Sequence, residues 1–397
     1  MHLRKRHIQS ILLKRTHIFP VLGIVGPRQV GKTTFLMQEW KVKLDARYVT
    51  LDKFEVVKRA QREPENFLLS ESNNLKRRLI IDEVQKVPVL FDSMKSIIDE
   101  KRRVGIFTVS GSVEFSDKSG IRESLAGRIG MARLYPLSLC ELAQQPLRTP
   151  WVKGWKGHVR QRTAKEVDTW LKRGGMPIFC ALRDDAEVRL AIESWLEAIC
   201  YRDLQQLKGA HLSGDVALAI MSSIARQPGI NLTRVAQDTG VSRASVLKHL
   251  AALEALFLVH KLPSLDNRKA VPEYALFDAA VLRHFLGDGD ESFARRQTLR
   301  TLVVNEILAQ YEYSGAGRPG LFSYRSRGGA KVDLVLQDRK KILGIGMSIT
   351  SDISPYSLRS MKSFLNAHPS ASGIVLAPVT QGFTVDGIPI VPWTDIG

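Results

Sequence analysis

Short apolar runs and amphipathic stretches alternate along the first third of the chain. After the first apolar run, Phe35, Leu36 and Trp40 return at the spacing of one helix face. Runs of five to eight residues, the length typical of buried strands, occupy residues 20–25, 48–52, 78–83 and 105–112. Strands that alternate with helices predict an α/β domain with a parallel sheet.

The pattern becomes helical past this region. Residues 164–208 carry Leu, Ala, Trp and charged residues at helical spacing, which predicts a helical lid. A helix-turn-helix pattern follows, in which Asn231 caps a helix at 232–238, Gly240 forms the turn and Ser242 caps a helix at 243–256. Residues 257–262 then read as the first strand of a wing whose tip lies near residues 267–269.

The last part of the chain returns to α/β character. A helix is predicted at residues 299–311, followed by strands at 321–325, 331–337, 342–349 and 373–377. A chain of 397 residues is too long for one core. We therefore divide it into units at residues 1–145, 146–212, 213–272 and 273–397.

A phosphate-binding pattern follows the first predicted strand: Gly, four residues, then Gly-Lys-Thr. Gly26 and Gly31 let the backbone approach phosphate closely, and the N–H groups of the loop attract the anion. Lys32 is expected to neutralise the β- and γ-phosphates, and the Thr33 hydroxyl to ligand magnesium. The predicted nucleotide-binding residues are Gly26, Pro27, Arg28, Gln29, Val30, Gly31, Lys32, Thr33 and Thr34.

The run at residues 78–83 ends in two acids, Asp82 and Glu83. Carboxylates at the C-terminal ends of parallel strands lie in the crevice where α/β sheets bind ligands. We assign Asp82 to Mg²⁺ and Glu83 to the activation of water, which favours hydrolysis of ATP over transfer to a substrate group. Ser110 and Ser112 end a later run and are alternatives for sensing the γ-phosphate; we choose Ser112, against the alternative of a plain strand-end turn.

These motifs resemble prokaryotic AAA-type ATPases whose C-terminal half has no assigned function. The resemblance rests on residues 26–34, 79–88, 110–112, 123–128, 134–138, 141–142, 174–177, 201–204 and 332–335. It implies an AAA-type P-loop ATPase core with a helical lid, a winged helix-turn-helix and a restriction-endonuclease-like α/β domain. It also implies that Arg128 acts as an arginine finger or sensor, in its own chain or across a subunit contact. The alternative is a surface arginine at a helix end.

Nucleases with this C-terminal fold use an acid on the first helix, an Asp on one strand and Glu-x-Lys on the next. Glu306 and Asp333 match the first two positions, but Gly346 and Ser348 stand where the Glu and the Lys belong. Because two acids fix the metal and the lysine positions the water, we predict a degenerate nuclease site without activity. Lysines near enough in sequence to replace the missing one are Lys331, Lys340 and Lys341.

The charge balance favours a polyanionic partner. Lys plus Arg number 58 against 40 acids, giving a net charge of +18 and a pI near 9.9. A basic segment with tryptophans, suited to a nucleic-acid backbone or to a solvated linker, contains Arg148, Trp151, Lys153, Trp155, Lys156, His158, Arg160, Arg162 and Lys165. Side chains on the helix-turn-helix that could contact DNA are Ser242, Arg243, Ser245 and Lys248, with His249 as a further candidate. The alternative is a helix-turn-helix that packs as a lid.

Cysteine usage and hydropathy point to the cytoplasm. Cys140, Cys180 and Cys200 share no metal-ligand spacing, so we expect reduced thiols. The chain has no apolar run of membrane-spanning length, and we expect no membrane partner. The basic N-terminus followed by residues 11–13 lacks the apolar core and cleavage site of a secretion signal.

Two functions of different classes remain open. The first is an ATP-binding and ATP-hydrolysing AAA-type switch or motor that acts on or near DNA, with ATP and Mg²⁺ as its ligands. The alternative is a nucleotide-gated scaffold that binds a protein partner or further copies of itself. A metal-dependent nuclease ranks third, because Gly346 and Ser348 supply neither the missing acid nor the missing lysine.

Overall fold

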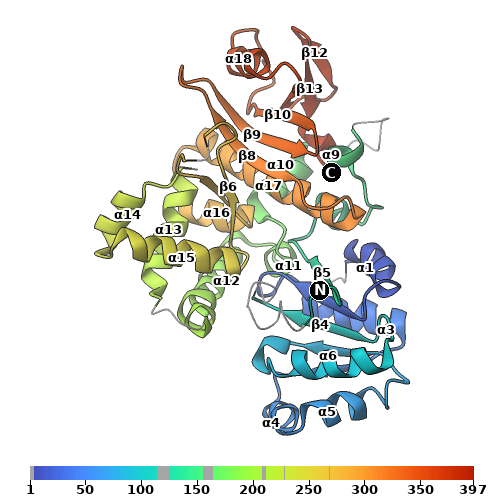
Figure 1. The fold of residues 1–397 in the computed structure, drawn as a ribbon. Helices are drawn as coiled ribbons and strands as arrows, with labels where there is room; N and C mark the ends of the chain where they lie inside the picture. The colour runs from blue at the N-terminus through green and yellow to red at the C-terminus, as the bar shows by residue number, and fades with distance from the viewer. Residues whose placement is uncertain (1–3, 114–124, 155–163, 208–211, 228, 268) are drawn as a thin grey trace.

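The computed structural model describes residues 4–113, 125–154, 164–207, 212–227, 229–267 and 269–397. A five-stranded sheet and a six-stranded sheet lie at opposite ends of the molecule, with the helical segments between and beside them (Figure 1). Trp155 to Arg162 of the basic segment, Arg268 of the wing, and Glu123 and Ser124 of the family motif lie outside the described residues.

The N-terminal sheet is parallel throughout, with strand order β2-β3-β4-β1-β5. Its strands are β1 (Val21–Val25), β2 (Arg47–Thr50), β3 (Leu79–Asp82), β4 (Phe107–Gly111) and β5 (Ile129–Arg133). Strands β1, β3 and β4 are buried along their full length, as strands covered on both faces must be. The four predicted strands are confirmed. Strand β5 was not predicted, because it is an edge strand whose apolar residues are interrupted by Gly130 and Arg133.

Short helices connect these strands. They are α1 (Ile8–Thr16), α2 (Lys32–Phe35), η1 (Leu36–Trp40), α3 (Lys41–Leu44), α4 (Phe54–Arg62), α5 (Pro64–Glu71), η2 (Val84–Lys86), α6 (Leu90–Lys101) and α8 (Leu139–Leu142). Helix α1 packs against both β1 and β5 and also against α17 of the C-terminal half. The N-terminal helix thus joins the two halves of the molecule.

The middle of the chain is helical, as predicted. Its helices are α9 (Pro150–Lys153), α10 (Ala164–Arg173), α11 (Pro177–Ala181), α12 (Asp185–Ala198), η3 (Ile199–Asp203), η4 (Leu204–Gln206) and α13 (Gly214–Arg226). Among the helices that the structure describes, none is both long and apolar enough to cross a membrane.

Two capped helices and a hairpin follow. Asn231 Oδ1 accepts from Arg234 N (3.0 Å) and starts α14 (Leu232–Thr239), while Ser242 Oγ accepts from Ser245 N (3.2 Å) and starts α15 (Arg243–Ala255). Gly240 lies in the left-handed region between them, at φ +68°. Strands β6 (Val259–Leu262) and β7 (Glu273–Leu276) pair antiparallel and lead into α16 (Ala279–Leu286). Both predicted helices are confirmed, and a strand, β6, lies within the predicted run at residues 257–262; that this hairpin is the wing of a winged helix stays a prediction.

The C-terminal sheet is mixed, with order β12-β13-β11-β10-β9-β8. Strands β8, β9 and β10 are antiparallel, and β10, β11 and β13 are parallel. Its elements are α17 (Glu291–Ser314), β8 (Gly320–Arg325), β9 (Lys331–Asp338), β10 (Lys341–Met347), α18 (Arg359–Ala367), β11 (Ser372–Ala377), β12 (Phe383–Val385), β13 (Ile388–Pro392) and η5 (Trp393–Asp395). The predicted helix at 299–311 is therefore the middle of a longer one.

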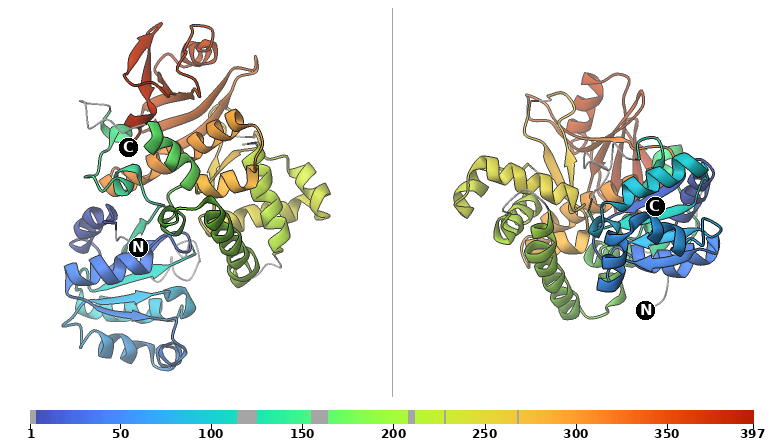
Figure 2. Two further views of the ribbon diagram at one scale, coloured as in Figure 1. Left: turned by 180° about the vertical axis from the view of Figure 1, so that it is seen from behind. Right: turned by 60° about the horizontal axis from the view of Figure 1, so that its bottom comes forward.

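One hydrophobic core crosses the proposed domain boundaries. It runs from Ile24 in β1 through Met176 and Trp195 in the helical segment to Val246 in α15 and Val303 in α17. The left view in Figure 2 shows the yellow-green helices of about residues 214–255 at one side of the molecule, while α9, α10 and α16 pack against α17. Because the four proposed units share one core, a displacement of one unit changes the packing of the units next to it.

Candidate nucleotide site

The turn between β1 and α2 adopts the conformation that the glycine spacing predicts. Gly31 has φ +101°, a conformation that other residues rarely adopt. A Cβ on Gly26 would lie 2.3 Å from the carbonyl oxygen of Leu134. The loop therefore needs glycine at Gly31 for its conformation and at Gly26 for its packing.

Lys32 is buried beneath this loop. Its Nζ donates to the carbonyl oxygens of Gly26 (2.8 Å) and Pro27 (2.9 Å), which holds the amine inside the turn. Burial lowers the pKa of Lys32 to about 8, while the carboxylates of Glu83 and Asp82 act in the opposite direction. The Lys32 amine thus lies inside the loop and lines the cavity, where it can contact a phosphate bound by the loop.

Asp82 ends β3 and is fully buried. Three hydroxyl groups in the described part of the chain donate hydrogen bonds to it: Thr33 Oγ1 at 2.6 Å, Tyr48 OH at 2.9 Å, and Ser110 Oγ. The contact with Asp82 and its own burial raise the pKa of Tyr48, so the phenol stays a donor. Thr33 and Asp82, the two predicted metal ligands, are thus brought together.

A Mg²⁺ ion fits this pair of residues. Magnesium is usually bound through one or two carboxylates together with substrate phosphates, not by a cage made of protein alone. One carboxylate and one hydroxyl lie next to the phosphate loop here, and the described residues contain no cluster of three or more His, Cys, Asp or Glu that could hold a metal. Thr33 and Asp82 would hold the ion together with the phosphates of a nucleotide.

Glu83 adopts the left-handed conformation (φ +59°), which turns the chain sharply after β3. Its carboxylate accepts from Gln85 Nε2, and Ser112 Oγ lies 3.5 Å from Glu83 Oε2. All three residues line the same cavity. The two predicted alternatives are thereby separated: Ser112 faces this cavity, whereas Ser110 is buried and holds Asp82.

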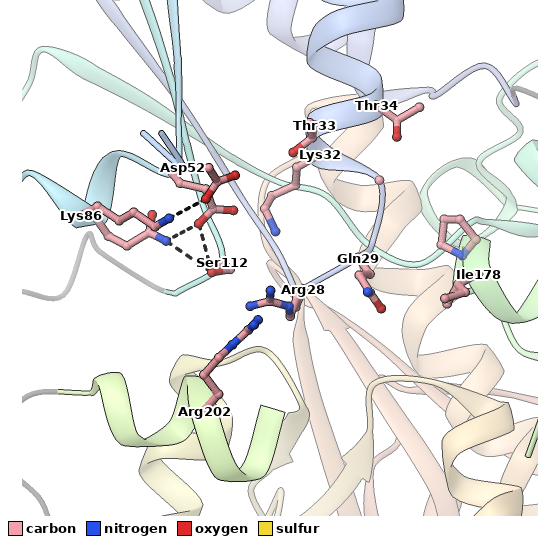
Figure 3. A pocket seen from close by; sticks show the side chains of 14 residues that line it. Arg28, Gln29, Lys32, Thr33, Thr34, Asp52, Lys86, Ser112, Ile178 and Arg202 are labelled. Atoms are coloured by element: carbon pink, nitrogen blue, oxygen red, sulfur yellow. Dashed lines mark hydrogen bonds and ion pairs between the residues drawn. The ribbon is translucent and has the colours of Figure 1, made fainter. Parts of the chain in front are cut away.

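A cavity of about 630 Å³ connects these groups. Residues of the loop line it on one side and Glu83, Gln85 and Ser112 on another, while Pro177, Ile178 and Arg202 of the helical segment close a third side. In Figure 3 the Arg202 side chain extends from the helical segment toward Arg28.

The helical segment is tied to the phosphate loop by an ion pair. Arg28 Nη1 donates to both carboxylate oxygens of Asp203, at 2.7 and 2.9 Å, and Trp195 Nε1 donates to the Arg28 carbonyl at 3.3 Å. Arg202 shares the same carboxylate through its Nε, at 3.2 Å. The sequence analysis placed residues 201–204 in a family motif but gave them no role. Arg28 and Asp203 are 175 residues apart, so no local sequence pattern predicts their contact.

Arg128 lies away from this cavity. It pairs with Asp99 at 2.7 Å on the surface and is not among the described residues that line the cavity. The structure therefore gives Arg128 no contact with the nucleotide site of its own chain, and a role across a subunit boundary stays a prediction.

The predicted DNA-contacting residues of α15 differ in exposure. Ser242, Arg243 and Lys248 are exposed and Ser245 is half-buried. His249, the further candidate, is buried: its Nε2 accepts from Ser213 N at 2.9 Å and its Nδ1 lies 2.8 Å from the Ser245 carbonyl oxygen. Both ring nitrogens are used inside the protein, so His249 is removed from the set of surface candidates.

The two acids of the predicted nuclease site do not meet. Glu306 Oε2 accepts from Leu139 N at 3.0 Å, far along α17 from the part of this helix that contacts Asp333. Asp333 accepts instead from Arg296 Nη2 (2.9 Å) and from Met347 N (2.8 Å). Ten residues of helix separate Arg296 from Glu306, which is about 15 Å. The expectation that Glu306 and Asp333 form one degenerate site is corrected: Asp333 is paired with a cation that sequence reasoning did not anticipate.

The lysines proposed as substitutes do not take that place either. Lys331 Nζ pairs with Glu273 at 3.6 Å, and Lys340 and Lys341 are exposed at the turn between β9 and β10. Glu273 also accepts from the buried Arg300, at 2.6 Å. This group of charges joins the β6–β7 hairpin to α17 and β9.

Comparison with known proteins assigns the first part of the chain. The family model described as an AAA domain matches residues 19–143, the segment that contains the parallel sheet and the phosphate loop. Residues 19–143 are therefore similar to an AAA domain, and their parallel sheet and phosphate loop resemble an AAA-type P-loop ATPase core. Two models described only as domains of unknown function match the rest: DUF8612 at residues 164–292 and DUF4143 at residues 297–396.

Relatives are found along nearly the whole chain. The uncharacterized proteins Rv2008c of Mycobacterium tuberculosis and Mb2031c of Mycobacterium bovis are each 25% identical over 374 residues, which covers 92% of this chain and 78% of the relative. Their descriptions name no activity.

Solved structures give weaker matches. A signal transduction ATPase with numerous domains from Pyrococcus horikoshii aligns with 79% of this chain and 47% of its own, at TM-score 0.32 and 11% identity. This chain thus spans about half the length of that protein. AMPPCP-bound DnaA from Aquifex aeolicus aligns with 62% of this chain and 85% of its own, at TM-score 0.30 and 11% identity. TM-scores this low do not establish a shared fold.

Proposed function

We propose that the chain is a magnesium-dependent ATP hydrolase that works as a switch or motor on or near DNA. The observation that carries the proposal is the convergence of Lys32, Thr33 and Glu83 on one cavity, with the buried Asp82 hydrogen-bonded to Thr33 beside it. A cation, a metal-binding pair and a carboxylate for water are the three parts that phosphoryl transfer to water requires.

Each side chain has a separate task in hydrolysis. Lys32 exchanges the carbonyl oxygens of Gly26 and Pro27 for phosphate oxygens. Thr33 and Asp82 would hold Mg²⁺, which would supply neutralisation of negative charge on the phosphates. Glu83 accepts the proton of the attacking water, and Gln85 and Ser112 hold its carboxylate toward the cavity.

The contact between Arg28 and Asp203 supports action as a switch. Arg28 belongs to the loop that receives phosphate, and Asp203 belongs to the helical segment. Phosphate and Asp203 compete for the same guanidinium, because both are anions that pair with Arg in a bidentate way. Binding of nucleotide thereby loosens the helical segment from the loop, and release of phosphate restores the contact.

The test is steady-state ATP hydrolysis by the full chain with Mg²⁺ and after its removal by EDTA. Hydrolysis that depends on Mg²⁺ and is lost in Lys32→Ala supports the proposal. The matched control is Lys86→Ala, because Lys86 lines the same cavity but pairs with Asp52 at 2.5 Å. Wild-type protein that neither binds nor hydrolyses ATP would contradict the proposal.

Action on DNA is supported by the net charge of +18 and by the exposed Arg243 and Lys248 on α15. ATPase activity is to be measured with and without duplex and single-stranded DNA across salt concentrations. We expect stimulation that weakens with salt and that is lost in the charge reversal Arg243→Glu with Lys248→Glu. Lys101→Glu, at an exposed position on α6, is the control.

One observation favours the alternative of a nucleotide-gated scaffold. Leu247 lies beside Lys248 on α15 and is 51% exposed. An apolar side chain makes no contact with phosphate, and protein–DNA interfaces are more polar and more positively charged than interfaces between proteins. The alternative gains support if DNA leaves ATP hydrolysis unchanged at every salt concentration and if self-association seen with ATP by light scattering is lost in Leu247→Asp.

A further inference from the structure

The turn at residues 174–178 forms the uncharged wall of the nucleotide cavity. Pro177 and Ile178 line the cavity at the start of α11. Pro177 also stands close to the phosphate loop: a Cβ placed on Gly31 would lie 3.7 Å from Pro177 Cγ. An apolar wall at this position suits the nucleoside part of a nucleotide, since the phosphates are drawn to Lys32 and to the N–H groups of the loop.

Two parts of the molecule hold this turn from opposite sides. On the ATPase side, Leu137 N donates to the Gly175 carbonyl at 2.7 Å. On the C-terminal side, Asp278 Oδ2 accepts from Gly175 N at 2.8 Å and from Met176 N at 3.1 Å. The position of Pro177 and Ile178 therefore depends on a carboxylate that lies 102 residues from Met176 in the sequence.

The two oxygens of Asp278 have different tasks. Oδ1 caps α16 by accepting from Ala280 N (2.9 Å) and Val281 N (3.3 Å). Among the described residues, Oδ2 accepts from the backbone N–H groups of the turn. The residue is 1% exposed. Gly174 leaves the space that this requires, because a Cβ there would lie 2.2 Å from Asp278 Oδ1.

We propose that Asp278 is a positioning residue for nucleotide binding, which places the 174–178 turn against the nucleoside and ties that contact to α16 of the C-terminal half. The proposal rests on the proposed function, since it specifies which part of the ATP molecule the turn contacts. A displacement of α16 by a bound partner would move Asp278, and with it the wall of the cavity.

The substitution Asp278→Asn separates the two tasks. An asparagine has one acceptor oxygen and one NH₂ donor group. If the asparagine oxygen caps α16, its NH₂ group faces the N–H groups of Gly175 and Met176. All of these groups are donors, so no hydrogen bond to the turn can form. Burial raises the pKa of Asp278 to about 6, against the effect of the four N–H groups, so an assay at pH 8 compares an ionised carboxylate with an amide.

The experiment measures the binding of two probes to the full chain by calorimetry at pH 8: Mg–ATP and inorganic tripolyphosphate. Only ATP has a nucleoside to contact the turn. In Asp278→Asn we expect the Kd for Mg–ATP to rise roughly tenfold, because one to two hydrogen bonds that hold the turn are lost. The Kd for tripolyphosphate should stay within about twofold of the wild-type value. KM for ATP should rise by more than kcat falls.

Two further variants make the test specific. Asp290→Asn changes the N-cap of the neighbouring α17, where Asp290 accepts from Ser292 N at 2.9 Å and touches no part of the turn; both probes should bind it as they bind wild type. Ile178→Ala shortens the wall directly and must reproduce the selective loss of ATP affinity even if Asp278→Asn does not fold.

Three outcomes would overturn the inference: unchanged ATP affinity in folded Asp278→Asn, equal loss for ATP and tripolyphosphate, or the same loss in Asp290→Asn. Unchanged ATP affinity in Ile178→Ala would also overturn it. None of these is the failure of the proposed function, which would show as absence of ATP binding or hydrolysis in the wild-type chain.

Discussion

Asp82 in the N-terminal sheet and Asp333 in the C-terminal sheet are both buried carboxylates on strands. The side chains that donate hydrogen bonds to them differ in charge. Asp82 accepts from the hydroxyl groups of Thr33, Tyr48 and Ser110, whereas Asp333 is held by the guanidinium of Arg296. Hydroxyl donors orient a carboxylate without cancelling its charge, so Asp82 remains able to attract a cation. The charge of Asp333 is already balanced within the protein.

The neighbours of the two acids extend the contrast. Glu83 follows Asp82 directly and lines a cavity of about 630 Å³. Gly346 lies on β10, next to Asp333 on β9. The backbone N–H of Met347, the residue after Gly346, donates a hydrogen bond to the Asp333 carboxylate. The two acids therefore differ in their hydrogen-bonded partners and in what lies beside them: a cavity next to Glu83, and a backbone N–H next to Asp333.

The largest expected effect is on the N-terminal site. Lys32→Ala should weaken nucleotide binding by roughly a hundredfold or more, because the charge-assisted contacts to phosphate are lost. Calorimetric titration with Mg–ATP measures this, with Lys86→Ala as the control. Near wild-type affinity in Lys32→Ala would show that the amine buried in the loop is not used for phosphate.

Glu83→Gln should leave ATP binding intact and lower kcat by about 10²- to 10⁴-fold, since the amide cannot accept the proton of water. The comparison of single-turnover hydrolysis with equilibrium binding separates the two steps. If turnover is undiminished, Glu83 has no part in the mechanism, and Asp52, which lines the same cavity, would be the next carboxylate to test.

Arg296→Ala tests the claim that the charge of Asp333 is balanced by this guanidinium. The substitution leaves a carboxylate with little exposure and without its cation, and we expect a loss of about 1–2 kcal/mol in the free energy of unfolding. Lys362→Ala breaks the surface pair with Asp386 and should cost no more than a few tenths of a kcal/mol. Equal effects in urea unfolding would show that the Arg296–Asp333 pair is an ordinary surface contact.

Arg128 tests whether the N-terminal site is complete in one chain. If Arg128 acts across a subunit boundary, ATP hydrolysis per molecule rises with protein concentration, and Arg128→Ala removes that rise. Arg102→Ala, an exposed arginine at the end of α6, is the control. Full activity at dilutions where light scattering detects only monomer would exclude this role.

We expect no phosphodiester cleavage by this chain. The full chain should not nick supercoiled, linear or single-stranded substrates with Mg²⁺ or Mn²⁺, because one paired carboxylate cannot fix a metal and position water. Nicking that disappears in Asp333→Ala would show an active site in the C-terminal sheet and would remove the contrast with Asp82.

Much of the N-terminal half was predictable because its signals are local. Strands β1 to β4, the conformation of the phosphate loop and the caps at Asn231 and Ser242 each depend on residues within a few positions of one another. Such short-range spacing is read directly from a sequence. Strand β5 was missed because an edge strand lacks the continuous apolar run of a buried one.

The tertiary structure decided which charged groups meet. Arg28 pairs with Asp203 across 175 residues, Leu139 N donates to Glu306 across 167, and Asp278 holds Gly175 across 103. Each contact requires two elements to pack in one register, and no spacing along the chain encodes that. The sequence by itself thus determined the phosphate loop and the two acids at the end of β3, because both patterns are local. Packing decided that Asp82 is held by hydroxyl donors, that Asp333 is paired with Arg296, and that Asp278 holds the turn beside the cavity.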